Sequence, residues 1–140
     1  MEAELPNVEK ARQRIIRALE IVRAHAEPGD LGLAVLDEKV KSAKDAKELT
    51  DLLNSRIAQL GNSAHDVSQV ADLEEAIWKW VYEEAYAFTA RLGRQTLAKR
   101  RMFDSMDNTA CWVLEPGQEY LNALLDAIGR ADLKNIVRID

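Results

Sequence analysis

The 140-residue sequence contains few of the residues from which recognisable sites are built. It has one cysteine, Cys111, and two histidines, His25 and His65, which lie far apart in the chain. One cysteine cannot form an internal disulfide bond, which fits a reducing compartment. The sequence has no cysteine cluster and no His-Glu-x-x-His or Glu-x-x-His motif. We therefore expect no metal and no cofactor, and we interpret these three residues as structural or solvated.

Turn-forming residues and long apolar runs are also scarce. The chain has only 6 glycines and 3 prolines, and its glycines are isolated, so it lacks phosphate-binding loops and the nucleophile motif Gly-x-Ser-x-Gly. The first ten residues, MEAELPNVEK, have no apolar segment of the kind found in signal peptides. No run approaches the roughly 18 apolar residues that a membrane span requires. We expect a cytoplasmic protein without a membrane segment.

The residues that are abundant favour helices. Apolar residues make up 47% of the chain and charged residues 31%, with a net charge of −5. A chain rich in Ala, Leu, Glu, Lys and Arg and poor in turn formers is typical of an all-helical protein. At this length we predict a single all-α domain over residues 1–140.

Three amphipathic helices are predicted in the first half of the chain. The first spans about 7–26, with Asn7 as its cap. Apolar residues at three-four spacing mark its buried face: Val8, Ala11, Ile15, Ala18, Leu19, Val22 and Ala26. After a break at 28–30, a second helix carries the stripe Leu33, Leu36, Val40 and Ala43. Asp45 and Glu48 have the spacing of a capping box that opens a third helix, and Gly61 is placed to end it.

The longest predicted helix, about 66–92, is apolar on nearly every face. Its residues form two stripes and an aromatic group: Leu73, Ile77, Val81, Ala85, Phe88 and Leu92; Ala76, Trp80, Ala87 and Ala90; and Trp78, Tyr82 and Tyr86. A helix that is apolar all round needs neighbours on all sides. We therefore predict a bundle of five or six helices packed around it. At Gly93 the helix either kinks or ends before a separate helix over 94–103.

The C-terminal part of the chain is predicted to contain one more helix and an extended pair. Cys111 to Leu114 is short and apolar, which favours an extended segment. Pro116 suits the first turn of a last helix running to about Ile128. The apolar tail, 133–139, is expected to pack back on the domain as a strand beside 110–114.

The carboxylates of Glu83 and Glu84 lie within the most apolar part of the chain. Neither has a basic residue four positions later, so a buried carboxylate here needs a partner from another helix or a proton. Arg14, Arg17 and Arg56 are the available partners. The structural interpretation is a salt bridge or simple exposure at a groove, and the functional one is a ligand site on the long helix. That site would be lined by Trp78, Trp80, Tyr82, Glu83, Glu84, Tyr86 and Arg91.

Charge along the long helix is strongly divided. Acids dominate between Asp66 and Glu84, whereas the segment 85–103 has five bases and no acid. Two such helices laid antiparallel would pair acid with base in both directions, as a symmetric dimer requires. The same bases form a candidate interaction surface for a partner or a phosphate: Arg91, Arg94, Lys99, Arg100 and Arg101.

No family resemblance is evident, so function is inferred from these features. The leading hypothesis is a non-catalytic helical interaction, adaptor or regulatory subunit that forms a homodimer or binds another protein. The alternative is a small-molecule or enzymatic site in the aromatic and carboxylate pocket. A third hypothesis, nucleic-acid or phosphate binding through 91–101, is disfavoured for nucleic acid by the acidic net charge and the lack of interleaved aromatic residues.

Overall fold

The structure is a computed structural model that describes residues 4–27, 29–61, 70–100 and 106–139. Five α-helices and one short 3₁₀ helix make up these residues: α1 (Glu4–His25), α2 (Leu31–Ser42), α3 (Ala46–Leu60), α4 (Leu73–Arg100), α5 (Met106–Ala127) and η1 (Ala131–Leu133). The described residues contain no strand. The all-helical prediction is confirmed. No helix among them is both long and apolar enough to cross a membrane.

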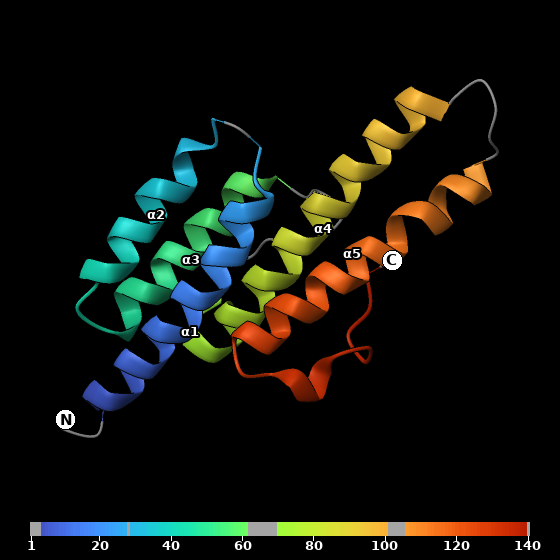
Figure 1. The fold of residues 1–140 in the computed structure, drawn as a ribbon. Coiled ribbons are helices and arrows are strands. Elements are labelled where there is room, and N and C mark those ends of the chain that lie inside the picture. The colour runs from blue at the N-terminus through green and yellow to red at the C-terminus, as the bar shows by residue number, and fades with distance from the viewer. Residues whose placement is uncertain (1–3, 28, 62–69, 101–105, 140) are drawn as a thin grey trace.

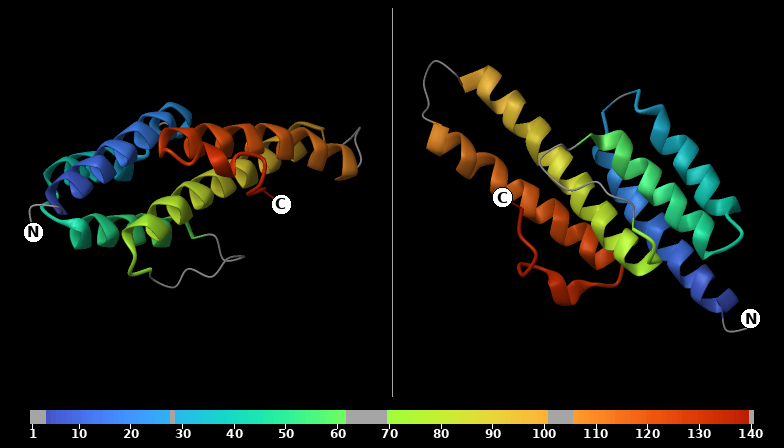
Figure 2. Two further views of the ribbon diagram at one scale, coloured as in Figure 1. Left: turned by 90° about the horizontal axis from the view of Figure 1, so that it is seen from below. Right: turned by 180° about the vertical axis from the view of Figure 1, so that it is seen from behind.

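The helices pack in two layers with one helix at the edge. Helices α1 and α5 lie side by side in one layer and α3 and α4 in the other, while α2 packs against α1 and α3 (Figure 2). The end of α4 and the start of α5 extend together beyond the other helices (Figure 1). Figure 1 also shows that the carboxyl ends of α1 and α3 and the amino end of α2 lie at the same end of the bundle.

Helix α1 confirms the predicted buried stripe but not the predicted cap. Its stripe residues from Val8 to Val22 are all buried in the core. The helix is already formed at Glu4, so Asn7 is a helical residue and not the cap. Pro6 lies in the first turn, where the backbone N–H groups have no partner within the helix and a proline is tolerated.

The predicted caps of α3 are confirmed at both ends. Asp45 accepts a hydrogen bond from the N–H of Glu48 at 2.9 Å. Glu48 reaches back and accepts from the N–H of Lys44 at 3.1 Å, one residue earlier than in the usual capping box. Gly61 ends the helix with φ +64°, a left-handed conformation that favours glycine.

Helix α4 differs from its prediction at both ends. It begins at Leu73 and residues 70–72 are not helical, so a continuous helix from 66 is wrong; the proposed start itself lies in 62–69, outside the described residues. It continues through Gly93 to Arg100, so of the two alternatives predicted at Gly93 the end of the helix is wrong. It packs against α5, α3 and α1, while Trp78, Tyr82 and Tyr86 are only half-buried. The neighbouring helices therefore leave one side of α4 partly exposed, contrary to the prediction. Large aromatic side chains such as Trp and Tyr are often only partly buried.

Helix α5 overturns the predicted extended segment. It begins at Met106, so 110–114 is helical and Pro116 lies inside the helix, not in its first turn. A four-residue apolar run does not distinguish a strand from a buried helix, and the helical neighbours on both sides decide the outcome. The strand pairing with the C-terminal tail is therefore wrong.

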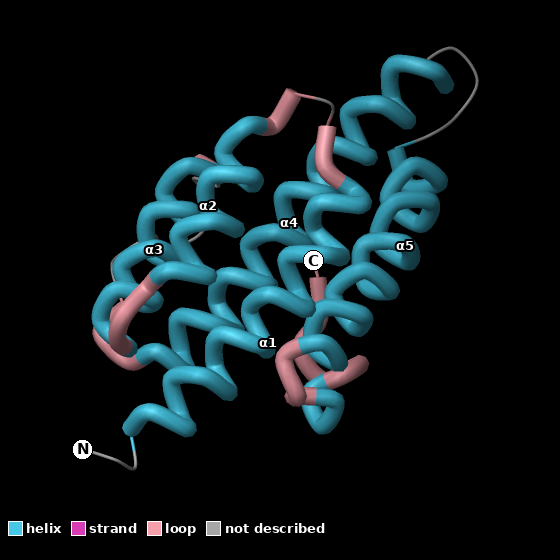
Figure 3. Tube along the Cα trace, turned by 60° about the vertical axis from the view of Figure 1, so that its left-hand side comes forward, coloured by secondary structure: helices cyan, strands magenta, loops and turns pink. Residues whose placement is uncertain are grey.

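The tail packs back on the molecule, as predicted, but it does so through side-chain hydrogen bonds from α5. Gln118 donates to the carbonyl of Val137 at 2.9 Å and accepts from the N–H of Ile139 at 2.9 Å. Asn122 holds Asn135 in the same two-way manner, at 3.0 and 3.2 Å. Figure 3 shows the tail lying against the last turns of α5. The side-chain amides of Gln118 and Asn122 thus hold the tail, in place of the predicted strand pairing.

Arginines of α1 bind the carboxyl end of α5. The Nε atoms of Arg14 and Arg17 donate to the carbonyls of Ile128 and Ala127, at 2.5 and 3.1 Å. These carbonyls carry the negative end of the helix dipole, so cations there are stabilising. Gly129, with φ +77°, then turns the chain out of the helix.

Helices α4 and α5 approach closely where Gly117 faces Thr89. A Cβ atom on Gly117 would lie 2.1 Å from the Thr89 hydroxyl oxygen, which is closer than any real contact. Gly93, also within a helix, has nothing within 4 Å of the equivalent position. Glycine is therefore required at 117 by packing and is dispensable at 93.

We expect Gly117→Ala to destabilise the protein by about 1–3 kcal/mol, because the added methyl group forces the two helices apart. The matched control, Gly93→Ala, should be neutral or stabilising by about 0.5–1 kcal/mol, since alanine is the better helix former. Urea unfolding followed by circular dichroism measures both. Equal effects of the two substitutions would show that the helices do not approach closely at 117.

The ion pair between Arg14 and Glu74 predicts a pH dependence of stability. Two hydrogen bonds from Arg14, at 2.7 and 2.8 Å, lower the pKa of Glu74 below its ordinary value of about 4.5. A lowered carboxyl pKa stabilises the fold above that ordinary value, and this stabilisation is lost as the pH falls through the folded-state pKa. Glu74→Gln should cost roughly 0.2–1 kcal/mol at pH 7 and progressively less below pH 4.5, measured by urea unfolding. A cost independent of pH, or one shared by Glu75→Gln, would contradict this assignment.

Candidate functional site

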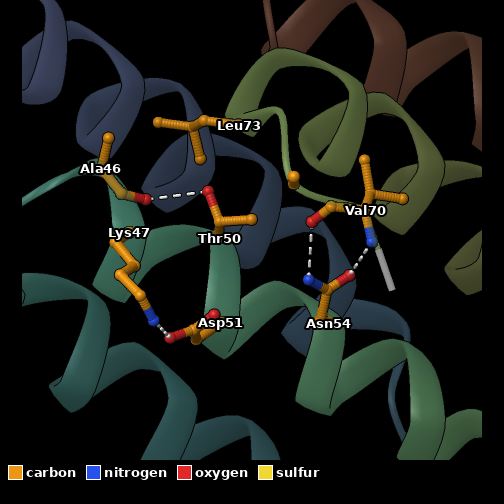
Figure 4. A pocket seen from close by; sticks show the side chains of 8 residues that line it. Ala46, Lys47, Thr50, Asp51, Asn54, Val70 and Leu73 are labelled. Atoms are coloured by element: carbon orange, nitrogen blue, oxygen red, sulfur yellow. Dashed lines mark hydrogen bonds and ion pairs between the residues drawn. The ribbon is translucent and has the colours of Figure 1, made fainter. Parts of the chain in front are cut away.

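Several hollows in the described part of the chain could hold a site. The first, about 610 Å³, lies between the start of α3 and residues 70–73. Figure 4 shows that its polar side chains are already paired: Lys47 with Asp51 at 3.0 Å, and Asn54 with both backbone groups of Val70. Thr50 donates to a backbone carbonyl of its own helix at 2.8 Å. These pairs explain how the segment before α4 is fixed to α3, and they leave little chemistry for a ligand.

The second hollow, about 720 Å³, lies between α1 and the turn after α5. Its arginines are those that bind the end of α5 and Glu74, together with Arg130. Arg130 pairs with Asp132 at 3.1 Å. We interpret this hollow as a structural junction.

The third hollow is a small cleft of about 90 Å³ to which all five helices contribute. Its walls come from the end of α1, the start of α2, the end of α3, the middle of α4 and one residue of α5. The lining residues are Val22, His25, Ala26, Asp30, Leu33, Arg56, Leu60, Glu84, Ala87, Phe88, Arg91 and Tyr120. Charged and aromatic side chains meet here, so this cleft is the candidate site.

A buried ion pair forms the floor of the cleft. Arg56 donates to both carboxylate oxygens of Glu84, at 2.6 and 3.1 Å, and the indole N–H of Trp80 donates to the same carboxylate at 2.9 Å. The side chains of Arg56 and Glu84 are 8% and 5% exposed. The partner that an unpaired Glu84 was predicted to require is therefore Arg56. These contacts give both carboxylate oxygens of Glu84 a hydrogen-bond donor in the interior.

Opposing effects act on the charge of Arg56. Burial lowers the pKa of its guanidinium, whereas the hydrogen bonds and charges of Glu84 and Asp30 raise it, and the net shift is upward. Asp30 accepts from Arg56 at 3.4 Å from the exposed mouth of the cleft. Arg56 is therefore a permanent cation in the cleft.

Three aromatic rings form one wall. His25 stacks on Tyr120 with ring centroids 4.7 Å apart, and Phe88 meets both rings edge-on at 5.7 and 4.6 Å. The Nδ1 atom of His25 lies 2.9 Å from the carbonyl of Ile21. A carbonyl can only accept, so Nδ1 carries a hydrogen and Nε2 is the nitrogen that is left for other contacts.

Arg91 ties the carboxyl end of α1 to α4. Its guanidinium donates to the carbonyl of His25 at 2.6 Å, lies 3.7 Å from Glu27, and sits 5.7 Å from the centre of the Phe88 ring. This cation both caps α1 and holds the aromatic wall in place.

Two buried polar groups of the cleft have no partner among the described residues. The hydroxyl of Tyr120 makes no hydrogen bond there, although the residue is only 6% exposed. The Nη1 group of Arg56 likewise donates to no acceptor, whereas its Nε and Nη2 groups do. A buried polar group left without a hydrogen bond costs about 1–3 kcal/mol. Both groups line the same cleft, where a bound molecule would supply the missing partner.

The structure brings together only part of the predicted ligand site. Glu84 and Arg91 line the cleft, and Trp80 lies fully buried behind Glu84. The other members are not lining residues. Trp78, Tyr82 and Tyr86 are half-buried, Tyr82 lies 3.5 Å from the carbonyl of Arg138, and Glu83 is buried at 2% exposure.

The most informative cleft residues were not predicted from the sequence. Tyr120 and His25 lie 95 positions apart and come together only through packing of α1 against α5. No local motif signals such a contact. Arg56 was identified only as one of three partners available to Glu84.

The predicted basic interaction surface is described only in part. Arg94 is exposed, whereas Arg91 is engaged within the chain. The side chains of Lys99, Arg100 and Arg101 lie outside the described residues, as do those of His65 and Cys111.

Comparisons with family models, curated proteins and solved structures found no match to this chain. Within the described part of the chain, no group of three or more His, Cys, Asp or Glu residues is arranged to hold a metal ion. The cleft geometry is thus the basis for a functional proposal.

We predict that Tyr120 ionises at a higher pH than an ordinary tyrosine, because of its environment. Burial, reinforced by the charge of Glu84, raises the pKa of Tyr120 well above its ordinary value of about 10. Tyr120→Phe should therefore leave the tyrosinate absorbance between pH 9 and 11 unchanged while circular dichroism shows the fold intact. An amplitude lower by one tyrosine's share would contradict the buried placement. A raised pKa also means that the stability due to this group is present below pH 10 and is lost as the pH rises above it.

Proposed function

We propose that this protein binds a small polar molecule in the cleft between its five helices. The observation that supports the proposal is the pair of buried polar groups, Tyr120 hydroxyl and Arg56 Nη1, that share one cleft and have no partner among the described residues. Ligand sites commonly combine apolar and aromatic walls with a few oriented polar groups, as this cleft does.

The rigidity of the walls also supports binding. Arg56, Glu84 and Trp80 are held by hydrogen bonds to one another, and Arg91 lies over the Phe88 ring of the aromatic wall. A ligand that enters preformed walls loses less free energy to ordering than one that must organise them. The cleft opens between His25 and Asp30, which are both exposed. A ligand larger than the cleft would therefore keep its remainder outside.

Self-association is the second proposal, and it is favoured by a different observation. Leu31 and Val35, one turn apart on α2, are 77% and 47% exposed. The charge argument for a dimer is weaker than the sequence suggested, because Glu83 and Glu84 face the interior and Arg91 is paired within the chain. A dimer would therefore bury the outer face of α2 and not rely on α4.

Native mass spectrometry of freshly purified, untagged protein tests both proposals together. We expect a small additional mass on the native protein that is reduced in Tyr120→Phe. The matched control Tyr82→Phe removes the same hydroxyl away from the cleft and should retain the mass. A dimer without added mass would support self-association.

A ligand that is lost during purification can still be found by adding small acids, amides, amines and alcohols one at a time and measuring the thermal unfolding temperature. A ligand that binds only the folded state raises the unfolding temperature with its concentration. No added mass and no member of the panel raising that temperature would overturn the ligand-binding proposal.

A further inference from the structure

The buried hydrogen-bonding groups of the cleft that have no partner among the described residues offer mainly donors. The Nη1 group of Arg56 carries two N–H donors and no acceptor, and the Tyr120 hydroxyl has one donor and can also accept. Glu84, the buried acceptor, already receives three hydrogen bonds from Arg56 and Trp80. A ligand that accepts hydrogen bonds would therefore fit these two buried groups.

The amino end of α2 adds a positive potential at the cleft border. Asp30 and Leu33, which line the cleft, stand at the beginning of this 12-residue helix. Asp30 does not cap the helix with its side chain, and the N–H groups of Gly32 and Leu33 have no acceptor among the described residues. Uncapped helix N-termini favour negative charge.

The charges of the walls limit the charge of the ligand. Arg56 and Arg91 are balanced by Glu84 and Asp30, so a dianion would meet two carboxylates without a surplus of cations. Glu84 lies behind Arg56, and Asp30 lies at the mouth with its side chain 32% exposed, where water screens it. A single negative charge in direct contact with Arg56 would gain charge-assisted hydrogen bonds, roughly twice as strong as neutral ones.

The volume of the cleft limits the size of the buried group. About 90 Å³ corresponds to roughly three water molecules at their liquid volume of about 30 Å³ each. A planar carboxylate with one or two carbon atoms is of this size, and its two oxygens offer acceptors to two donors at once.

From these observations we propose that the cleft binds a small monocarboxylic acid, whose carboxylate accepts hydrogen bonds from Arg56 Nη1 and Tyr120 Oη. This inference rests on the proposed ligand-binding function and specifies its substrate class. The remainder of a longer acid would leave through the mouth between His25 and Asp30. A carboxylate at the end of a peptide shares the chemistry and is one outcome of the test.

The experiment is a titration of the ¹⁵N-labelled full chain with sodium acetate at constant ionic strength, followed by NMR. The reporters are the indole N–H of Trp80, which contacts Glu84, and the amides of Gly32 and Leu33 at the start of α2. We expect saturable shifts of these signals. Acetamide, a neutral isostere, should bind at least about tenfold more weakly, because it lacks the charge that strengthens the bond to Arg56.

Three variants sharpen the assignment without removing the buried ion pair. Tyr120→Phe should weaken acetate binding several-fold, and the control Tyr82→Phe should not change it. Asp30→Asn removes a negative charge from the mouth, so it should strengthen acetate binding. If Asp30→Asn instead weakens binding, or if Tyr120→Phe has no effect, the assignment is wrong.

The remaining outcomes separate this inference from the proposed function. If acetamide or methylammonium shifts the cleft signals as strongly as acetate does, the carboxylate inference fails and ligand binding stands. If none of the three shifts these signals, both fail for ligands of this size. If short peptides bind through their terminal carboxylate far more tightly than acetate, the ligand source is a protein terminus and the free-acid proposal is overturned.

Discussion

The ion pair between Arg56 of α3 and Glu84 of α4 is the constraint on which the cleft depends. Both side chains are taken out of water, and such burial is tolerated only when the pair is also satisfied by further hydrogen bonds. Trp80 supplies one for Glu84, and Asp30 supplies one for Arg56 from the loop before α2. The pair thereby fixes α3, α4 and the entry into α2 relative to one another. The Nη1 group of Arg56 has no acceptor among the described residues, and it borders the cleft.

Much of the fold could be predicted from the sequence because local patterns determine it. The three-four spacing in α1 identifies its buried face, and Asp45, Glu48 and Gly61 mark the ends of α3 through backbone geometry that depends on neighbouring residues. Prediction failed where local signals were ambiguous. Pro116 was placed at a helix start, where it is common, although α5 accommodates it in its interior. Gly93 lies within a helix that is long enough to tolerate it.

The sequence indicated a residue of the candidate site only where a charged side chain falls on an apolar helix face without a local partner. Glu84 is a charge on an apolar face without a neighbour to pair with. The sequence therefore indicated that, once buried, it would need a partner from another helix or a proton, but it left the burial itself open. Tyr120 and His25 carry no such signal, because a tyrosine or histidine on a helix is compatible with many environments. Their stacking is a property of how α1 packs on α5. Long-range contacts of this kind become visible only when the helices are placed.

A high-resolution crystal structure, grown without carboxylate buffers and then soaked in acetate, tests the central claim most directly. The account predicts that Tyr120 Oη and Arg56 Nη1 make no hydrogen bond to protein atoms and that a planar ligand lies within hydrogen-bond distance of both. A structure in which protein side chains fill the cleft and bond to these two groups would contradict it.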